Sequence, residues 1–268
     1  MFKSRYLGAL LVSMLMLAAC SENPLSPEHG SVTNGQNESA LGKAAQALAI
    51  LKDHGFVTEN CIRESQHLIL EQDMRFEIED VLRLQDQAPN GMGKNPARQD
   101  EIQQWRHVFV VSQSRVSDIK VSLAANVPLA WKTAIRRAMA EWSRIPGSRI
   151  RFREVTYGQD MTIAVGYVSN PNFIAEATFP DYYGRSGPRV MINRNFLNKP
   201  DGEKVATMVH ELGHTIGMRH INNVEPSRYH IPGTPLYDPY SIMHPNILGA
   251  WRGFSSGDII AAQRLYPR

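Results

Sequence analysis

Residues 210–220 read HELGHTIGMRH, and this stretch decides both the fold and the chemistry. On a helix, His210 and His214 lie one turn apart and present their imidazoles from the same face. Gly217 accepts a positive φ, so a turn after the helix can return His220 to the same point. A catalytic zinc ion takes three protein ligands and keeps a fourth position for water. We therefore predict a zinc site with His210, His214 and His220 as its ligands.

Glu211 directly follows the first of these ligands and can point toward a water molecule on the metal. Zinc lowers the pKa of such a water from 15.7 to about 7. A carboxylate beside it can act as general base, because it takes the proton as the water attacks a carbonyl and then delivers that proton to the leaving amine. The predicted catalytic residue is Glu211, and the predicted reaction is hydrolysis of peptide bonds.

These residues resemble the extended zinc signature of the metzincin peptidases. Metzincins also have a methionine turn beneath the metal, and residues 241–244 read SIMH, much like the turn of astacin-like enzymes. By this resemblance Met243 forms a hydrophobic base under the zinc and is not a ligand. The resemblance implies a zinc-dependent endopeptidase of the α+β class, with a mixed twisted sheet, an active-site helix and a Met-turn.

A closer resemblance is to the bacterial dual-action HEIGH metallopeptidases. It rests on MVHELGH at 208–214, IPGTP at 231–235 and DPYSIM at 238–243, with a looser match in LEQDM at 70–74. Leu212 replaces the isoleucine of the family's name, which is a conservative change at a position facing away from the metal. The resemblance implies that an edge strand, Ala175–Phe179, binds a protein or peptide substrate in extended form through main-chain hydrogen bonds.

One departure from the astacin-like pattern concerns the group that stabilises the oxyanion. Those enzymes have a tyrosine two residues after the turn methionine, and this chain has Pro245 there. Tyr237 and Tyr240 are either substitutes for that tyrosine or packed loop residues. His230 and His244 are near the turn but fit no part of the signature, so we predict structural or solvent-exposed positions for both.

The order of helices and strands after position 104 predicts one mixed sheet covered by helices. Strand-like runs occur at 108–111, 119–124, 150–155, 161–167 and 190–193. Pro128 opens a helix whose apolar face includes Trp142, and Asp201 can cap the active-site helix. Ser255 and Asp258 form a capping-box pattern before the last helix, so we interpret Asp258 as a cap residue.

The first twenty residues are typical of a secretory signal peptide. Lys3 and Arg5 precede an uncharged apolar run, 7–19, that is too short to span a bilayer comfortably. Residues 17–20, LAAC, resemble the bacterial lipobox, in which Cys20 is acylated and becomes the new N-terminus. This resemblance implies a lipid-anchored, extracytoplasmic protein of the bacterial cell envelope, and the residue after the cysteine favours the outer membrane. The alternative is a plain cleaved leader.

Composition along the chain predicts four parts. They are the lipoprotein signal peptide at 1–19, a flexible polar tether at 20–40, a small N-terminal region and linker at 41–103, and the metzincin-like peptidase domain at 104–268. Within the third part, apolar periodicity predicts a helix ended by Gly55, a short strand at 68–70 and a second helix at 78–85. This N-terminal region is a possible pro-region.

The net charge of +3 implies no nucleic acid partner. We expect a monomer that touches the membrane through its lipid anchor only. With Cys20 acylated, Cys61 has no intramolecular disulfide partner. Two rival hypotheses are a zinc hydrolase of another bond or of its own N-terminal part, and a catalytically silent surface lipoprotein that uses the fold for binding or adhesion. The second needs no general base beside zinc, so Glu211 argues against it.

Overall fold

The computed structural model describes residues 21–22, 34–71, 73–86, 104–221, 229–235, 238–246 and 249–268. The predicted signal peptide, Cys20 and most of the linker lie outside these residues. Within the described part, no helix is both long enough and apolar enough to cross a membrane.

The peptidase region is built on parallel strands with one antiparallel neighbour. The strands β5 (Ile119–Leu123), β6 (Phe152–Glu154), β7 (Met161–Gly166) and β9 (Arg189–Asn193) pair in parallel, and β8 (Ala175–Thr178) pairs antiparallel with β9. Three helices accompany them, α3 (Leu129–Arg144), α4 (Asp201–Thr215) and α5 (Ser256–Leu265). The predicted α+β class is confirmed.

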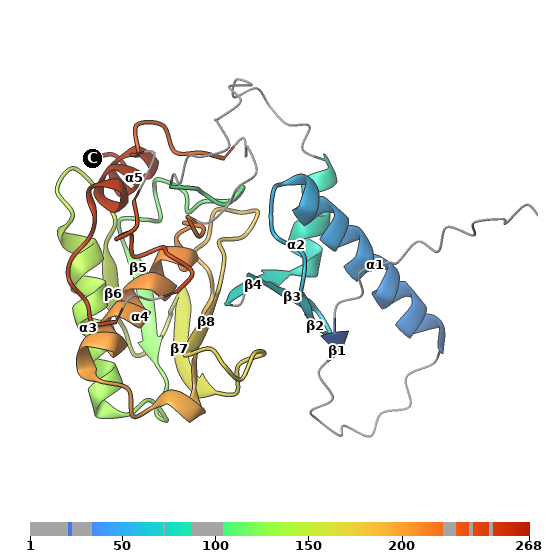
Figure 1. Ribbon diagram of the computed structural model, residues 1–268, viewed down its shortest axis with the longest axis horizontal. Coiled ribbons are helices and arrows are strands. Elements are labelled where there is room, and N and C mark those ends of the chain that lie inside the picture. Colours follow the sequence, from blue (N-terminus) through green and yellow to red (C-terminus); the bar gives the residue numbers. More distant parts are fainter. Residues whose placement is uncertain are drawn as a thin grey trace, which may run out of the picture.

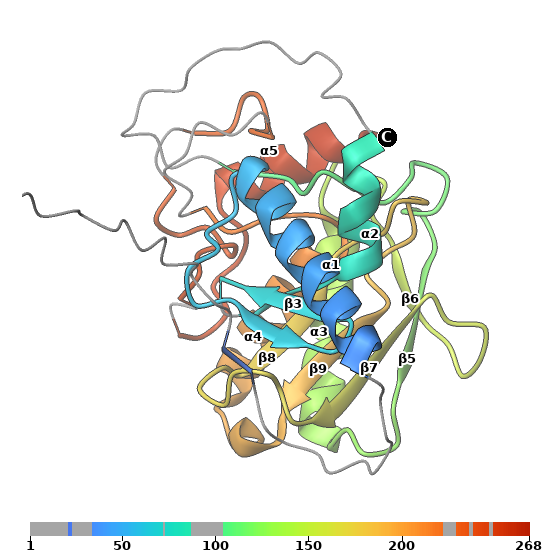
Figure 2. The ribbon, with the colours of Figure 1, turned by 90° about the vertical axis from the view of Figure 1, so that its right-hand side faces the viewer.

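The N-terminal region extends the same sheet. Its strands are β1 (Ser21–Glu22), β2 (Ile62–Glu64), β3 (His67–Leu70) and β4 (Met74–Glu77), and the complete sheet order is β1-β2-β3-β4-β8-β9-β7-β5-β6. Helices α1 (Asn34–Asp53) and α2 (Ile78–Leu82) lie over β3 and β4, and a 3₁₀ helix, η1 (Arg83–Asp86), follows. The N-terminal elements, coloured blue to cyan, stand beside the peptidase region, and α1 faces the viewer when they are seen from their own side (Figures 1 and 2).

Two expectations for the N-terminal part, one about a boundary and one about Cys61, differ from the structure. Helix α1 begins at Asn34 and β1 pairs with β2, although residues 20–40 were expected to form a tether. A lack of apolar residues predicts that a segment cannot fold alone, but it does not prevent a helix from extending outward from its buried part, Ala44 to Leu51. Cys61 is disulfide-bonded, which contradicts the expectation that it has no partner, and the other sulfur lies outside the described residues.

The expected strand at 108–111 is also absent from the described residues, because side chains take its backbone donors. Phe109 N–H donates to His107 Nδ1 at 3.1 Å, and Val111 N–H donates to the hydroxyl of Tyr266 at 3.1 Å. A segment whose amides bind side chains in this way has no ladder to offer a neighbouring strand. Phe109 and Val111 are nonetheless buried, and Phe109 belongs with Phe179 to the core cluster that the N-terminal region forms.

The main core lies between the parallel strands and the pair α3–α4. Trp131, Ile135 and Trp142 on α3 are fully buried, as their helical spacing predicts. The indole N–H of Trp142 also donates to the carbonyl of Val209 at 2.8 Å, so α3 holds α4 directly at the turn before His210. The core therefore fixes the helix that carries the predicted metal ligands.

Replacing Trp142 by alanine is expected to lower the free energy of unfolding by about 3–5 kcal/mol, because a large buried side chain and a helix–helix hydrogen bond are lost together. Urea unfolding followed by circular dichroism measures this change. Thr133→Ala, at an exposed position of the same helix, is the control and should change stability by less than about 0.5 kcal/mol. Equal stabilities of the two variants would contradict the packing described here.

Candidate metal centre

Helix α4 presents its ligands from a fully buried position. Every residue from Lys204 to Thr215 is buried, and the helix begins after Pro200, so Asp201 is its first residue and not its cap. Gly213 allows a close approach from below, because a Cβ at this position would lie 2.6 Å from the sulfur of Met243. Glycine inside the motif is thus required by the methionine turn, which the sequence did not reveal.

The chain reverses after α4 through Gly217, as predicted. Gly217 has a φ of 97°, and a Cβ there would approach the carbonyl oxygen of Phe109 to 3.0 Å. The amides of Gly217 and Met218 donate to the carbonyls of His214 and Gly213, which closes the end of the helix. This turn brings His220 back beside α4.

The three predicted ligands meet at one point. The Nε2 atoms of His210 and His214 are 3.0 Å apart, and each lies 3.2 Å from Nε2 of His220. All three side chains are fully buried. Nδ1 of His210 lies 2.6 Å from the carbonyl of Ile242, and Nδ1 of His214 lies 2.8 Å from the carbonyl of Met218.

These contacts determine the tautomers. A carbonyl only accepts, so Nδ1 of His210 and of His214 carries the hydrogen, and Nε2 of a neutral ring then presents its lone pair. Lone pairs that converge at 3.0 Å in a buried site repel one another unless a cation lies between them. The arrangement fits a metal ion with imidazole ligands.

A fourth donor, Asp73, completes the site from the N-terminal region. Its carboxylate oxygens lie 3.3 Å from Nε2 of His210, 3.6 Å from Nε2 of His214 and 3.2 Å from Nε2 of His220. Four donors placed 2.0–2.1 Å from one ion at tetrahedral angles are about 3.3 Å apart. The buried group Asp73, His210, His214 and His220 therefore has the size that a four-coordinate zinc ion requires.

Asp73 reaches the site at the tip of a hairpin. Strands β3 and β4 pair antiparallel with Leu70 opposite Met74, so Glu71 and Asp73 lie in the connection between them. Glu71 has a φ of 47°, an uncommon left-handed conformation for this residue type, and its carboxylate lies 3.5 Å from Nδ1 of His220. Sequence reasoning missed both acids as site residues, because only a loose family match pointed to 70–74.

The pKa values of two carboxylates, Asp73 and Glu211, are shifted in opposite directions. Although burial alone would raise the pKa of Asp73, the positive charge of His220 and the close contacts with the imidazoles hold it well below its usual range. Burial, followed by the charges of Asp73 and Glu176, raises the pKa of Glu211 well above its usual range. Burial lowers the pKa of His214 to about 4, against the opposing effect of Asp73.

Glu211, the predicted general base, is a buried carboxylate that follows His210 on α4. Its side chain is 1% exposed, and no donor in the described part of the chain makes a hydrogen bond to its Oε2 atom. A buried carboxylate oxygen without a donor is costly, and a catalytic site is a common reason for one to persist. The arrangement leaves this oxygen able to accept a proton from a substrate water.

The methionine turn is fixed by Asp258. This carboxylate accepts hydrogen bonds from the amide of Ile242 at 3.0 Å and from the hydroxyl of Ser241 at 2.7 Å. Asp258 also forms the predicted capping box with Ser255, but the expectation that it acts only as a cap is wrong. Because the carbonyl of Ile242 contacts His210, Asp258 orients this predicted ligand through the backbone of one residue.

The remaining sequence candidates stand apart from the four donors. Nε2 of His230 lies 3.2 Å from the hydroxyl of Thr234, and Nδ1 of His244 contacts the carbonyl of Asn246. Neither histidine belongs to the buried metal-site group. Tyr240 is 77% exposed, and Tyr237 lies outside the described residues.

Comparison with known proteins points to one family. The model of the dual-action HEIGH metallo-peptidases matches residues 82–227, more than half of the chain. Macrophage metalloelastase of Rattus norvegicus is 28% identical over 148 residues, which are 49% of this chain and 28% of that protein. The chain thus spans little more than a quarter of the length of this curated relative.

Two solved structures are also similar to the chain. Myroilysin is 15% identical with a TM-score of 0.41, over 66% of this chain and 100% of that one. The hatching enzyme zinc-protease HCE-1 of the medaka fish Oryzias latipes is 18% identical with a TM-score of 0.40, over 59% of this chain and 93% of that one.

A helix with two ligands, a glycine turn that returns the third and a methionine turn beneath them define the metzincin class of metallopeptidases. Within that class, the chain belongs to the dual-action HEIGH metallo-peptidase family. The resemblance noted in the sequence is therefore confirmed.

Replacing His214 by alanine is expected to remove bound zinc, from about one ion per chain to less than a tenth, because one of the converging nitrogens is lost. Elemental analysis of protein purified without chelators measures the metal content. His244→Ala is the matched control and should keep the zinc, since His244 stands outside the site. Zinc retained by His214→Ala would contradict the ligand assignment.

Proposed function

We propose that the chain is a zinc-dependent endopeptidase, with His210, His214 and His220 as ligands and Glu211 as general base. Membership of a metallopeptidase family supports the reaction class. The observation that carries the proposal is the convergence of three buried imidazole nitrogens within 3.2 Å beside a buried, unsatisfied carboxylate. A catalytically silent binding protein does not need a buried carboxylate beside the metal.

The chain's own residues divide the chemical work. Zinc at this site supplies positive charge that polarises the peptide carbonyl and lowers the pKa of water. Glu211 accepts the proton of the attacking water and then donates it to the leaving amine. Burial, followed by the charges of Asp73 and Glu176, raises the pKa of Glu211, which makes it a stronger proton acceptor. Asp258 and Met243 hold the turn that orients His210.

Substrate binding is proposed along β8, the strand expected to receive an extended peptide. The expectation that this strand is an edge is wrong for the described chain, because β4 pairs with it. The amide of Ala177 donates to the carbonyl of Asp73 at 3.0 Å, and the amide of Phe179 lies 3.4 Å from the carbonyl of Arg75. Strand β4 thus uses the main-chain groups that an extended substrate would need.

We propose that the N-terminal region, within 41–103, is a pro-region that keeps the peptidase inactive. A catalytic zinc site keeps its fourth position open, whereas Asp73 lies at that position here. Strand β4 covers β8 at the same time. The active form therefore requires the hairpin at 67–77 to be displaced or removed.

Buried contacts fasten this region beside the metal ligands. The guanidinium of Arg219, next to His220, donates to the carbonyls of His54 and Gly55 at 3.1 and 2.6 Å. It also lies 3.4 Å from the centre of the Phe56 ring, close enough for a cation–π contact. These contacts support a docked, inhibitory conformation.

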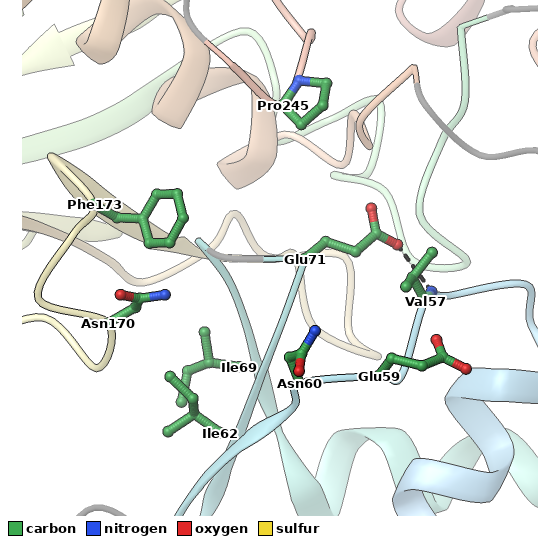
Figure 3. A pocket seen from close by; sticks show the side chains of 9 residues that line it. All are labelled: Val57, Glu59, Asn60, Ile62, Ile69, Glu71, Asn170, Phe173 and Pro245. Atoms are coloured by element: carbon green, nitrogen blue, oxygen red, sulfur yellow. Dashed lines mark hydrogen bonds between the residues drawn. The ribbon is translucent and has the colours of Figure 1, made fainter. Parts of the chain in front are cut away.

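The seam between the two parts is incompletely filled. A cavity of about 340 Å³ lies between N-terminal residues, among them Asn60, Ile69 and Glu71, and peptidase residues Asn170, Phe173 and Pro245 (Figure 3). The Glu71 carboxylate lines it and accepts a hydrogen bond from the amide of Val57. The N-terminal region therefore packs incompletely against the peptidase region. Such incomplete packing is expected of a segment that detaches from the peptidase region.

Two rival functions make different predictions. A zinc hydrolase of another bond would leave peptide libraries intact, and an enzyme that processes only itself would release the N-terminal region without cleaving added peptides. A silent surface lipoprotein would bind zinc and cleave nothing. The buried carboxylate of Glu211 favours the endopeptidase.

Lipid anchoring to the bacterial cell envelope through Cys20 stays a proposal, and the lipobox-like residues 17–20 support it. A sulfur that carries a thioether-linked lipid cannot also form a disulfide, and Cys61 is disulfide-bonded. A mass spectrum of the natural N-terminus, taken with and without reduction, distinguishes acylated Cys20 from the alternatives.

Replacing Asp73 by alanine is expected to raise the rate of casein cleavage by the full chain roughly tenfold or more. The reason is that the fourth position on the metal is freed when this ligand, which is tethered to the chain, is lost. The rate of casein hydrolysis at saturating zinc measures this. Glu79→Ala, an exposed acid of α2, is the control and should leave the rate unchanged. An Asp73→Ala chain that binds zinc but is no more active than the parent would contradict the inhibitory role.

Replacing Glu211 by alanine in the Asp73→Ala chain is expected to reduce casein hydrolysis by about 10²–10⁴-fold while zinc content stays at one per chain, because only the proton acceptor is lost. Hydrolysis and elemental analysis of the same sample measure both quantities. Glu203→Ala, on the same helix but outside the site, is the control. Unchanged hydrolysis in the Glu211→Ala chain would exclude Glu211 as the base.

A further inference from the structure

Glu176 is a buried carboxylate on β8, the proposed substrate-binding strand. Its side chain is 3% exposed. Oε1 accepts a hydrogen bond from Nη1 of Arg75 at 3.0 Å, and Oε2 accepts one from the amide of Ser169 at 3.1 Å. In the described part of the chain, its ion pairs within 4.0 Å involve Arg75 alone.

Arg75 comes from the N-terminal hairpin and not from the peptidase region. It lies on β4, two residues after Asp73, and its second nitrogen contacts Glu64 at 2.7 Å. Strand β4 binds β8 through main-chain groups, with Met74 opposite Ala177 and Arg75 opposite Thr178. The guanidinium of Arg75 thus pairs with the carboxylate of Glu176. It is carried by an extended strand and lies two residues after Asp73 of the metal site.

Displacing the hairpin removes the counter-ion of Glu176. The hairpin also covers β8, so its departure leaves the carboxylate of Glu176 able to pair with another cation. Glu176 directly precedes Ala177, whose amide donates to the carbonyl of Asp73 at 3.0 Å, so it lies close to the candidate metal site. Arg189 on β9 is the other cation in its neighbourhood, but it forms no ion pair with Glu176 in the described structure.

We propose that Glu176 is a specificity-determining residue, which receives the guanidinium or ammonium group of a substrate side chain close to the cleaved bond. This inference rests on the proposed endopeptidase function and names its substrate class as peptides with arginine or lysine. Arginine is preferred over lysine, because its planar group donates two hydrogen bonds to a carboxylate at once. In the inhibited chain, Arg75 takes the place of that side chain.

The first test compares two fluorogenic peptides that differ only in arginine against citrulline, a neutral residue of nearly the same shape. The enzyme is the full chain with Asp73→Ala and Arg75→Ala, and the variable residue is moved through the positions on both sides of the cleaved bond. We expect kcat/KM at one position to be at least tenfold higher for arginine, which corresponds to about 1.4 kcal/mol. Adding Glu176→Gln should reduce the ratio to about twofold or less.

Equal cleavage of both peptides at every position would overturn the proposal, and so would an arginine preference that survives Glu176→Gln. If neither peptide nor casein is cleaved although zinc is bound, the endopeptidase function itself fails. That outcome leaves the role of Glu176 to a second test that needs no activity.

The second test uses the Arg75→Ala full chain, in which methylguanidinium can occupy the space that the arginine leaves. We expect millimolar methylguanidinium to raise Tm by about 2 °C or more in a saturable way. Methylurea, which is neutral, should not raise it, and neither should methylguanidinium added to the Arg75→Ala/Glu176→Gln chain.

Arg185→Ala is the matched control for the second test, because it removes an exposed guanidinium from Asp181. The absence of a methylguanidinium effect in Arg75→Ala, or an equal effect in Arg185→Ala, would overturn the proposal. The second test measures thermal stability and not activity, so it decides the role of Glu176 even where the first test detects no cleavage.

Discussion

Three imidazole nitrogens forced within 3.2 Å of one another are the interaction on which the rest of the structure depends. Two of the rings give their Nδ1 hydrogens to the carbonyls of Ile242 and Met218, so their lone pairs converge in a space closed to water. That geometry tolerates little error, because a metal ligand displaced by a fraction of an ångström loses its bond. The close packing of Gly213 on Met243 and the left-handed turn at Gly217 both serve it.

Two carboxylates share this site, and their surroundings shift their pKa values in opposite directions. Contact with the imidazoles keeps Asp73 ionised, whereas burial and the neighbouring negative charge favour the protonated form of Glu211. Such separation is how one buried site can hold both an anionic ligand and an acid–base group. This difference in pKa couples the N-terminal hairpin to the proposed chemistry. Asp73, the anionic donor, comes from that hairpin, and Glu211, the proposed base, comes from α4.

The continuous sheet gives this coupling its form. Strand β8 has one neighbour from the peptidase region, β9, and one from the N-terminal region, β4. Main-chain pairing does not depend on sequence, which is why we propose that a substrate of similar conformation takes the place of β4 beside β8. Selectivity among substrates would then come from side chains between β4 and β8. The buried ion pair of Arg75 and Glu176 lies there.

The sequence by itself determined what depends on short spacing. Eleven residues, 210–220, place two ligands on one helical turn, the base beside them and the third ligand after a glycine, and helical periodicity predicted α3, α4 and α5. Met243 could be predicted from the family resemblance, because it lies a short distance downstream of the zinc signature. These features survive folding because local backbone geometry alone sets them.

Only the tertiary structure decided which distant residues meet. Nothing in the spacing of Asp73, Arg75 or Asp258 connects them to the zinc signature, because strand pairing and hairpin docking are set by the whole sheet. The segment 108–111 has the composition of a strand, yet His107 and Tyr266 take its amides. Local pattern therefore identified the metal ligands, whereas long-range pairing determined what covers them.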